Sequence, residues 1–538
     1  MKKLLSVFLA TVLVVLMVAV PVCAASRLDP SEGPWQQTQA YFYMLVDKAI
    51  QFVGKILNRF IPGLDWGKSW QNYDDYVTPE GFFEGEDTFE REVSPEAQWS
   101  AGYAYASLLD GLDVLNGEYS LAGSLQVAET LKPTGILDDQ GVTVYALSDG
   151  VSGTVVQAVV DGFGLARGDV LEIRNRLSAF AAENDIISIS ISVLHQHSLI
   201  DTLGMGVALL PALMLNPGMN AVGMGKENMM SGKNDQFMEN LYNVVTESVI
   251  DAVEDMEEGT LYYSCADITD LINDKRNPEV FDNEIHRFRF DPVNESSDEI
   301  WICQGSMHCT GLSGDNTDIS SDYPYYFKQY IKEATGADAV YVLGAELAIG
   351  SNRDNLKYTD TGKNSRIKAY GQEIAKRVLA IEEETSLEPV LNVAHREVAI
   401  KADNPVLILA AREGIVNSVA TKDGLGFTII TEIGYMELGN KIGIVLAPGE
   451  IAPEIIWGGA VSKEASWTKT SWDYAPLAET AGVEKVICFG LNNDQIGYIL
   501  TDNDIRSMFT ENEEINAASV KAGSVITTAF EELFATVK

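Results

Sequence analysis

Two histidines follow a run of alternating apolar and small polar residues at positions 187–193. The alternation has the period of a β-strand, and His195 and His197 share the parity of its apolar residues. Both imidazoles can therefore lie on one face where the strand opens into a loop. The chain has only five histidines, and neutral imidazole is the commonest metal-ligating side chain. The pattern indicates a metal site; the alternative is one structural histidine in the core and one in solvent.

Three more loops that follow expected strands carry side chains able to bind a metal. They contain His308, Glu450 and Tyr498. Loops at strand ends can bring such groups together from distant parts of a chain, because the sheet holds the backbone still. Each residue also has a structural alternative: a turn for His308, a carboxylate at a helix N-terminus for Glu450, and a buried aromatic ring for Tyr498.

The elements that must position these residues alternate between strands and helices. A strand at 154–160, a helix at 169–182 and a strand at 187–194 form a β-α-β unit. We further expect a helix at 322–335, a strand at 339–343, a hairpin of 427–438 and 441–446 turned at Gly439-Asn440, a strand at 485–489 and a closing helix at 517–537. The sequence predicts an α/β fold of mixed sheets with packed helices.

The first 24 residues have the pattern of a secretory signal peptide. Lys2 and Lys3 precede an apolar run, and small residues surround position 24. Cys23 leaves a lipoprotein as an alternative, and an uncleaved anchor is the third option. We expect an exported protein, secreted or associated with the cell envelope. The remaining cysteines are too few for a disulfide scaffold; Cys303 and Cys309 could form one bridge, but small core residues are the preferred interpretation.

Residues 25–98 are expected to form an N-terminal extension to a single large domain at 99–538. Apolar residues recur at helical spacing within 34–60, and Pro62-Gly63 stops the pattern. This amphipathic helix is expected to dock on the main domain, with peripheral contact to a membrane or micelle as the alternative. Residues 72–98 are acidic and turn-rich, which indicates a linker or an extended strap.

The charge balance restricts the class of partner. The chain has 38 basic and 78 acidic side chains, a formal net charge of −40, and signal cleavage would remove two more lysines. Nucleic acids and anionic membranes attract proteins over long range through basic surfaces. We therefore expect no nucleic-acid partner; the sequence leaves the oligomeric state open.

From Trp99 onward, several segments match one set of family motifs in order. The first three are Trp99-Ser100-Ala101-Gly102, which corresponds to Trp-x-x-Gly, the segment Gly135-Ile136-Leu137-Asp138-Asp139, and the strand ending at Asp161. Next come His195-Gln196-His197-Ser198, which corresponds to His-Thr-His-Ser, and His308 with the trailing Asn316-Thr317-Asp318-Ile319-Ser320. The last two are Pro448-Gly449-Glu450, which corresponds to Pro-Gly-Glu, and Gly490-Leu491-Asn492-Asn493 through Tyr498, which corresponds to Gly-Leu-x-Asn-x-Tyr-x-x-Tyr. In these motifs the chain resembles the neutral/alkaline non-lysosomal ceramidases, zinc amidases that cleave the N-acyl bond of ceramide.

The resemblance implies a zinc ion with one position left for water. Its ligands would be His195, His308, Glu450 and Tyr498. Such a nitrogen and oxygen ligand set suits catalytic zinc, which lowers the pKa of its water toward about 7.

The resemblance also implies roles for residues around the ion. His197 would be the acid–base group or a donor to the oxyanion, and Arg276 would be the family's active-site arginine, with a surface loop arginine as the alternative. Asp161 would orient a ligand histidine or cap a helix.

Two departures from the family bear on activity. The family's Gly-Asp-Val-Ser-Pro-Asn, whose serine lies at the active site, is aligned with residues 347–352, which places Gly350 at the serine and Ala348 at the aspartate. The chain also ends where the family's catalytic domain ends, so we expect the C-terminal β-sandwich domain to be absent. We expect a zinc-dependent hydrolase acting on ceramide or a related lipid amide. The alternatives are an esterase or amidase with another substrate, and a non-catalytic protein that binds lipid or glycan.

Overall fold

The computed structural model describes residues 71–123, 131–206, 232–312, 316–354, 356–358, 361–412, 414–424, 426–505 and 516–538, with scattered positions between 34 and 59. The expected signal peptide lies outside the described residues, as does most of the expected amphipathic helix. No described helix is long and apolar enough to cross a membrane.

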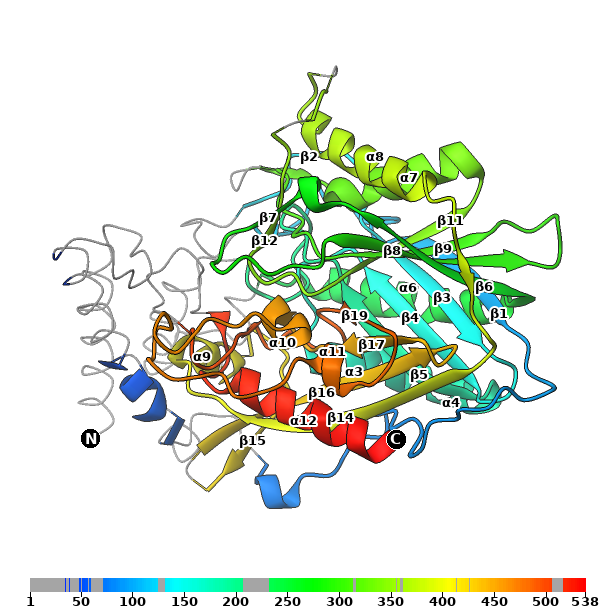
Figure 1. The fold of residues 1–538 in the computed structure, drawn as a ribbon. Coiled ribbons are helices and arrows are strands. Elements are labelled where there is room, and N and C mark those ends of the chain that lie inside the picture. Colours follow the sequence, from blue (N-terminus) through cyan, green and yellow to red (C-terminus); the bar gives the residue numbers. More distant parts are fainter. Residues whose placement is uncertain are drawn as a thin grey trace.

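Within the described residues, the larger sheet has nine strands (Figure 1). Its order is β11-β9-β8-β6-β1-β3-β4-β5, with β13 beside β6. The pairs β4–β5 and β9–β11 are parallel, and the other neighbours are antiparallel. The strands are β1 (Ser100–Ser107), β3 (Gly141–Ser148), β4 (Thr154–Val160), β5 (Ile186–Val193), β6 (Glu257–Asp267), β8 (Glu284–Pro292), β9 (Ile300–Gly305), β11 (Asp338–Leu343) and β13 (Thr385–Ser386).

A second sheet of five described strands packs against the first. Its order is β14-β16-β17-β19, with β15 beside β16. The strands are β14 (Leu391–Lys401), β15 (Ala420–Asp423), β16 (Gly426–Leu438), β17 (Ile442–Leu446) and β19 (Lys485–Phe489). Gly439 and Asn440 both have left-handed φ angles, 60° and 54°, as the tight turn between β16 and β17 requires.

Successive side chains of β4 point to opposite faces of the larger sheet, and this explains how the two sheets and the helices are layered. Val155 and Val159 belong to a core shared with Ile442 and Ile444 of the second sheet. Val156 and Val160 point the other way, into a core built with α6. Because every residue of β4 is buried, both faces of this strand are covered, one by the second sheet and one by helices.

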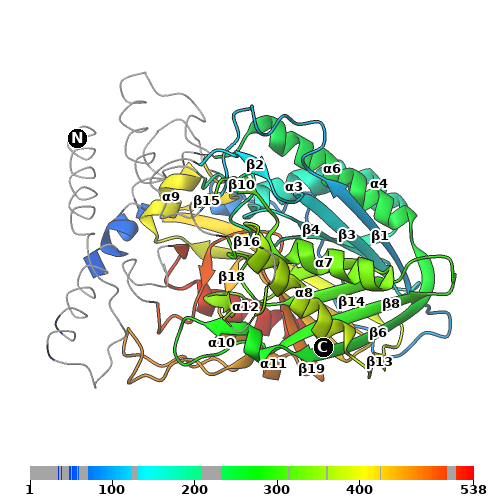
Figure 2. The ribbon, with the colours of Figure 1, turned by 90° about the horizontal axis from the view of Figure 1, so that it is seen from above.

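Helices cover the outer faces (Figure 2). Phe237, Leu241, Val245 and Val249 recur four residues apart in α6 and are fully buried against β1 and β3. α7 and α8 pack together beside β11, and α12 covers β14 and β16. The helices are α3 (Arg167–Arg176), α4 (Ser178–Glu183), α6 (Asp235–Glu254), α7 (Asp322–Thr335), α8 (Ser365–Leu379), α9 (Pro405–Arg412), α10 (Pro453–Trp457), α11 (Leu477–Thr480) and α12 (Ala522–Val537), with 3-10 turns η2 (Tyr73–Asp75) and η3 (Thr269–Leu271).

Three two-stranded pairs connect loops at the ends of the large sheets. They are β2 (Gly135–Ile136) with β10 (Asp318–Ile319), β7 (Ile272–Asp274) with β12 (Ile349–Ser351), and β18 (Glu450–Ile451) with β20 (Tyr498–Ile499). All three pairs contain residues close in sequence to the candidate site, so they fix the loops that carry it.

The mixed α/β prediction is confirmed, and most expected elements are present. The expected helix at 169–182 is divided, because α3 ends at Arg176 and α4 begins at Ser178. The Ser178 hydroxyl donates to the carbonyl of Asn175, which satisfies a group left open at the break. The closing helix begins at Ala522, five residues later than expected.

The N-terminal extension contacts the second sheet. Phe89 is 3% exposed in its core, and its amide donates to the carbonyl of Val537. Gly85 bridges Ala394 of β14. These contacts attach residues 85–89 to β14 and to the end of α12. Upstream, the Asn58 side chain accepts a hydrogen bond from the amide of Phe427.

The cysteines described by the structure are free thiols. Cys303 and Cys309 are buried in the core and form no bridge with one another. They are the small core residues that the sequence favoured.

Candidate metal centre

A buried glutamine separates the first two histidines and anchors their loop. Gln196 donates from Nε2 to Oδ1 of Asp161 at 2.7 Å and accepts from the amide of Gly162 at 2.9 Å. His195 has a left-handed φ of 53°, which turns the chain at the end of β5. Asp161 thus holds the loop through Gln196. The resemblance implied that its carboxylate would orient a ligand histidine, but its bond goes to Gln196 instead.

Backbone carbonyls orient both rings. Nδ1 of His195 lies 2.6 Å from the carbonyl oxygen of Phe163, and Nδ1 of His197 lies 2.8 Å from that of Gly123. A carbonyl oxygen only accepts, so each Nδ1 carries the proton and each Nε2 presents a lone pair. This is the arrangement by which proteins orient metal-ligating histidines.

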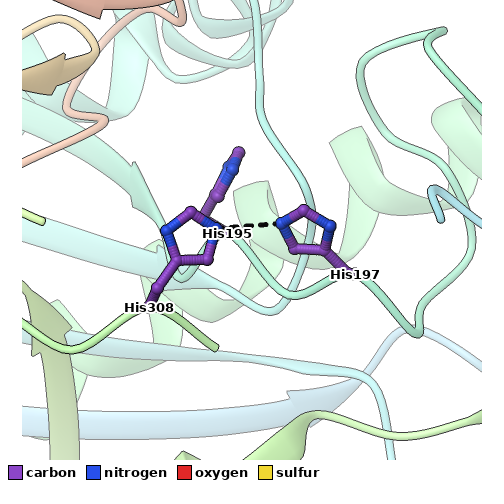
Figure 3. A group of neighbouring side chains, drawn as sticks. All are labelled: His195, His197 and His308. Atoms are coloured by element: carbon purple, nitrogen blue, oxygen red, sulfur yellow. Dashed lines mark hydrogen bonds between the residues drawn. The ribbon is translucent and has the colours of Figure 1, made fainter. Parts of the chain in front are cut away.

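His308 completes a group of three converging imidazoles (Figure 3). Its Nε2 lies 3.0 Å from Nε2 of His197, and its Nδ1 lies 2.8 Å from Oε2 of Glu346. The ring centroids of His195 and His308 are 4.7 Å apart. Two imidazole nitrogens at 3.0 Å need a proton or a metal ion between them, because two facing lone pairs repel.

Carboxylates close the other side of the group. Oε1 of Glu450 lies 3.6 Å from Nε2 of His195 and accepts from Gln495 at 3.3 Å. Possible ligand atoms of His195, His308, Glu346 and Glu450 all lie within 4.8 Å of one another. This largely buried cluster could hold a metal ion.

The separations fit a small tetrahedral ion. Zinc binds nitrogen and oxygen at about 2.0–2.2 Å, so two ligands at a tetrahedral angle lie about 3.4 Å apart. The 3.6 Å between Nε2 of His195 and Oε1 of Glu450 is close to that value. Small side-chain movements would close the cluster around an ion.

The electrostatics also favour a cation. Burial, reinforced by His308, lowers the pKa of His195 well below its ordinary value and that of His197 to about 3. Burial raises the pKa of the Glu346 carboxyl well above its ordinary value. The imidazoles of His195 and His197 are therefore neutral donors of lone pairs, and a bound cation would offset the cost of ionising the buried Glu346.

The cluster lies at the polar end of a cavity of about 350 Å³. His195, His197, His308, Glu450 and Tyr498 all line it, so the structure brings five of the six predicted site residues together. Tyr498 is directly opposite Glu450 in the β18–β20 pair. The remaining wall is mainly apolar and includes Phe163, Leu203, Met205, Leu407, Ala411, Val416, Ile429 and Ile496.

The sixth predicted residue, Arg276, is not among those that line the cavity. It is buried, and its guanidinium lies 2.8 Å from Oδ2 of Asp504. Lys275, one residue earlier, lines the cavity instead. Asp274 fixes this register, because its carboxylate accepts from the amides of Arg276 and Val280, each at 2.8 Å.

Only part of the segment that the sequence aligns with the serine motif reaches the cavity. Gly350 lies in β12 opposite Asn273 and does not line the cavity, whereas Ala348 does. Glu346 lies two residues before Ala348, and its Oε2 is 2.8 Å from Nδ1 of His308. Glu346 was not among the residues predicted from the sequence, although it lies just after β11.

No protein-family model matches this sequence, and no curated protein matches it either. Among solved structures, neutral ceramidase from Pseudomonas aeruginosa matches with a TM-score of 0.60 at 14% identity, over 82% of this chain and 74% of that chain. A ceramidase complexed with C2 matches with a TM-score of 0.57 at 15% identity, over the same shares. The chain therefore has the fold of a neutral ceramidase, with a possible His/Glu metal site inside it.

Proposed function

We propose that this protein is a zinc-dependent hydrolase that cleaves the N-acyl amide bond of ceramide or a related lipid amide. The observation that carries the proposal is the convergence of neutral imidazoles and Glu450 at the polar end of an apolar cavity. The ceramidase fold supports the choice of an amide, and the similar structure of a ceramidase complexed with C2 supports a lipid substrate.

The donor set suits zinc, which binds imidazole nitrogen and carboxylate oxygen in catalytic sites. His195, His308 and Glu450 would hold the ion, with the Tyr498 side chain beside them. When bound, zinc polarises a carbonyl group and makes water a stronger nucleophile at neutral pH. Glu346 would orient His308 through Nδ1.

His197 is the residue that we propose for proton transfer. Its Nδ1 is held by the carbonyl of Gly123, so its Nε2 is free of protons and directed to the centre of the cluster. The lowered pKa keeps this nitrogen neutral across the physiological range. His197 can accept a proton there and return it to the leaving nitrogen of the amide.

The apolar wall would hold the acyl chain. Leu407 and Ala411 reach the cavity from α9, and Ile429 reaches it from β16. Enclosing a hydrocarbon chain there gains about 25 cal/mol for each square ångström removed from water. The same contacts would exclude water from one side of the scissile bond.

A second candidate is an esterase or amidase with another acyl substrate. The departure from the family's serine motif favours it, because the sequence places Gly350 at the serine and the surroundings of the scissile bond would then differ from the family's. In either case, cleavage would rely on water.

The proposal includes export, with residues 1–24 as signal peptide, 25–98 as an extension and 99–538 as the hydrolase domain. The charge of −40 and the apolar run near the N-terminus support it. Mass spectrometry of the protein recovered from its native host, which locates the mature N-terminus, tests this part separately.

The experiment is release of fatty acid from ceramide by the zinc-loaded protein, followed by mass spectrometry. Glu450→Gln should abolish release. Glu454→Gln should retain it, because this buried carboxyl four residues further along does not line the cavity. A panel of ceramides, N-acyl amino acids and acyl esters decides between the two candidates. Bound zinc with no release from any of them would contradict a hydrolase.

A further inference from the structure

A second group of metal-binding side chains lies on the large sheet, outside the cavity. Possible ligand atoms of Cys265, Glu284 and His286 all lie within 4.8 Å of one another. Cys265 of β6 is directly opposite His286 of β8, and Glu284 precedes His286 by two residues. The pleat therefore places all three side chains on one face.

Hydrogen bonds fix the tautomer of His286. Its Nε2 lies 2.8 Å from Oδ2 of Asp282, and its Nδ1 lies 2.8 Å from the hydroxyl of Tyr263. The Asp282 carboxylate accepts from Nε2–H, so Nδ1 has the lone pair and accepts from Tyr263. A carboxylate on the far nitrogen is the partner that metal-ligating histidines usually have.

The thiol and the carboxylate already share a proton. Sγ of Cys265 donates to Oε1 of Glu284 at 3.1 Å. Lys485 forms an ion pair with the other oxygen of Glu284 from the start of β19. Its side chain is 36% exposed and can turn into solvent when a cation takes its place.

The site is open to solvent on the thiol side. Among the cysteines that the structure describes, Cys265 alone is half-buried, and the other three are buried. His286 is fully buried behind it, while the Glu284 side chain is 26% exposed. An ion can reach the thiol and carboxylate from outside, and it would take the place of the Tyr263 hydroxyl at Nδ1 of His286 on the inner side.

We propose that Cys265, Glu284 and His286 bind a second metal ion, with Asp282 as the carboxylate that orients His286. One sulfur, one nitrogen and one oxygen donor suit zinc, whereas calcium and magnesium prefer oxygen alone. The thiolate, Glu284 and nearby Asp282 balance the charge of a divalent ion. The ion would link β6 to β8 close to β19 of the second sheet. This structural role would be independent of hydrolysis.

Cobalt(II) distinguishes the two sites, because thiolate–cobalt bonds give an intense near-ultraviolet charge-transfer band that nitrogen and oxygen ligands do not. The full chain should bind two equivalents of cobalt and show the band. Cys265→Ser should bind one equivalent and lose the band. His195→Ala, at the cavity, should also bind one equivalent but keep the band.

Asp267→Asn is the matched control, because it removes a carboxylate two residues from Cys265 on the same face of β6, and it should change neither count nor band. X-ray absorption of the wild-type zinc protein needs no variant and should show a sulfur scatterer at about 2.3 Å. A wild-type protein that binds cobalt without the thiolate band, or zinc without any sulfur neighbour, would overturn the proposal.

Discussion

Replacing Glu346 by glutamine tests the arrangement of the metal centre most directly. Glu346 is fully buried, and its Oε2 lies 2.8 Å from Nδ1 of His308. Glutamine keeps the size of the side chain and an oxygen that can face Nδ1 of His308, but removes the negative charge. We expect the variant to fold and to bind zinc about 10–100-fold more weakly.

The magnitude follows from two opposing terms. With the imidazole between them, the carboxylate and the ion would lie about 6 Å apart, and at an effective dielectric constant of about 20 they attract by roughly 5 kcal/mol. Burial opposes ionisation, since it raises the pKa of this carboxyl well above its ordinary value. Part of the attraction is therefore consumed by removing the proton, and a net loss of about 1.4–2.8 kcal/mol corresponds to the expected 10–100-fold.

The same reasoning predicts a difference in pH dependence. Zinc binding to the wild type releases a proton from Glu346, so its zinc affinity increases with pH. The Glu346→Gln variant has no such proton to lose. It should release one proton fewer per zinc ion bound, so its zinc affinity should increase less steeply with pH.

Competition with a chromophoric chelator measures both quantities. Asp138→Asn is the control, because Asp138 is a buried carboxyl that accepts from Ser320 and Tyr326 and does not line the cavity. It should alter the unfolding midpoint and leave zinc affinity unchanged. An unchanged affinity in a folded Glu346→Gln protein would refute the orienting role, and a loss far beyond 100-fold would make Glu346 a direct ligand.

Three further predictions concern proton transfer, the acyl cavity and stability. His197→Gln should lower kcat by about 10²–10⁴ while one zinc ion at the cavity is retained; loss of that ion would show that His197 is a ligand. Leu407→Trp should fill the cavity wall and raise KM for long-chain ceramides more than for short-chain ones, as measured by fatty-acid release. Burial opposes ionisation of Glu432, but Arg174 and His395 outweigh it and hold the pKa of its carboxyl far below the ordinary value. Glu432→Gln leaves the Arg174 guanidinium buried without its carboxylate and should cost about 3–5 kcal/mol in urea unfolding at neutral pH. Because the pKa is lowered on folding, this difference from wild type should shrink as the pH falls below 4.5, the ordinary value for a glutamate, and a constant difference would contradict it.

Regular patterns in the sequence were enough to locate most of the elements near the site. The bounds of β4, α7 and β19 agree with the sequence prediction, because the two strands are apolar runs, the helix has one apolar face, and each element has turn or capping signals at its ends. The short pairs such as β18–β20 were not predicted, since two residues carry no periodicity. Those pairs depend on loops meeting in space, and it is they that set Glu450 opposite Tyr498.

The metal ligands could be predicted because only a few residue types bind a metal ion. An imidazole or carboxylate at a strand end could be recognised residue by residue, and His195, His308 and Glu450 lie in one cluster. Residues beside the ligands have no such restriction. Lys275 and Arg276 are adjacent in the bend after β7, yet Lys275 lines the cavity and Arg276 forms a buried ion pair with Asp504, so an error of one residue exchanges one environment for the other.

The segment at 347–352 shows a second limit of periodicity. Ala348 lies in a turn before β12 and has a left-handed φ of 65°, so the alternation of a strand does not decide which side chain of this segment reaches the cavity. The structure places Ala348 at the cavity and Glu346 against His308. A carboxylate beside a metal ligand can orient it, whereas a buried carboxylate with no cation to balance it only destabilises the fold. The full burial of Glu346 against His308 therefore favours a cation at this centre.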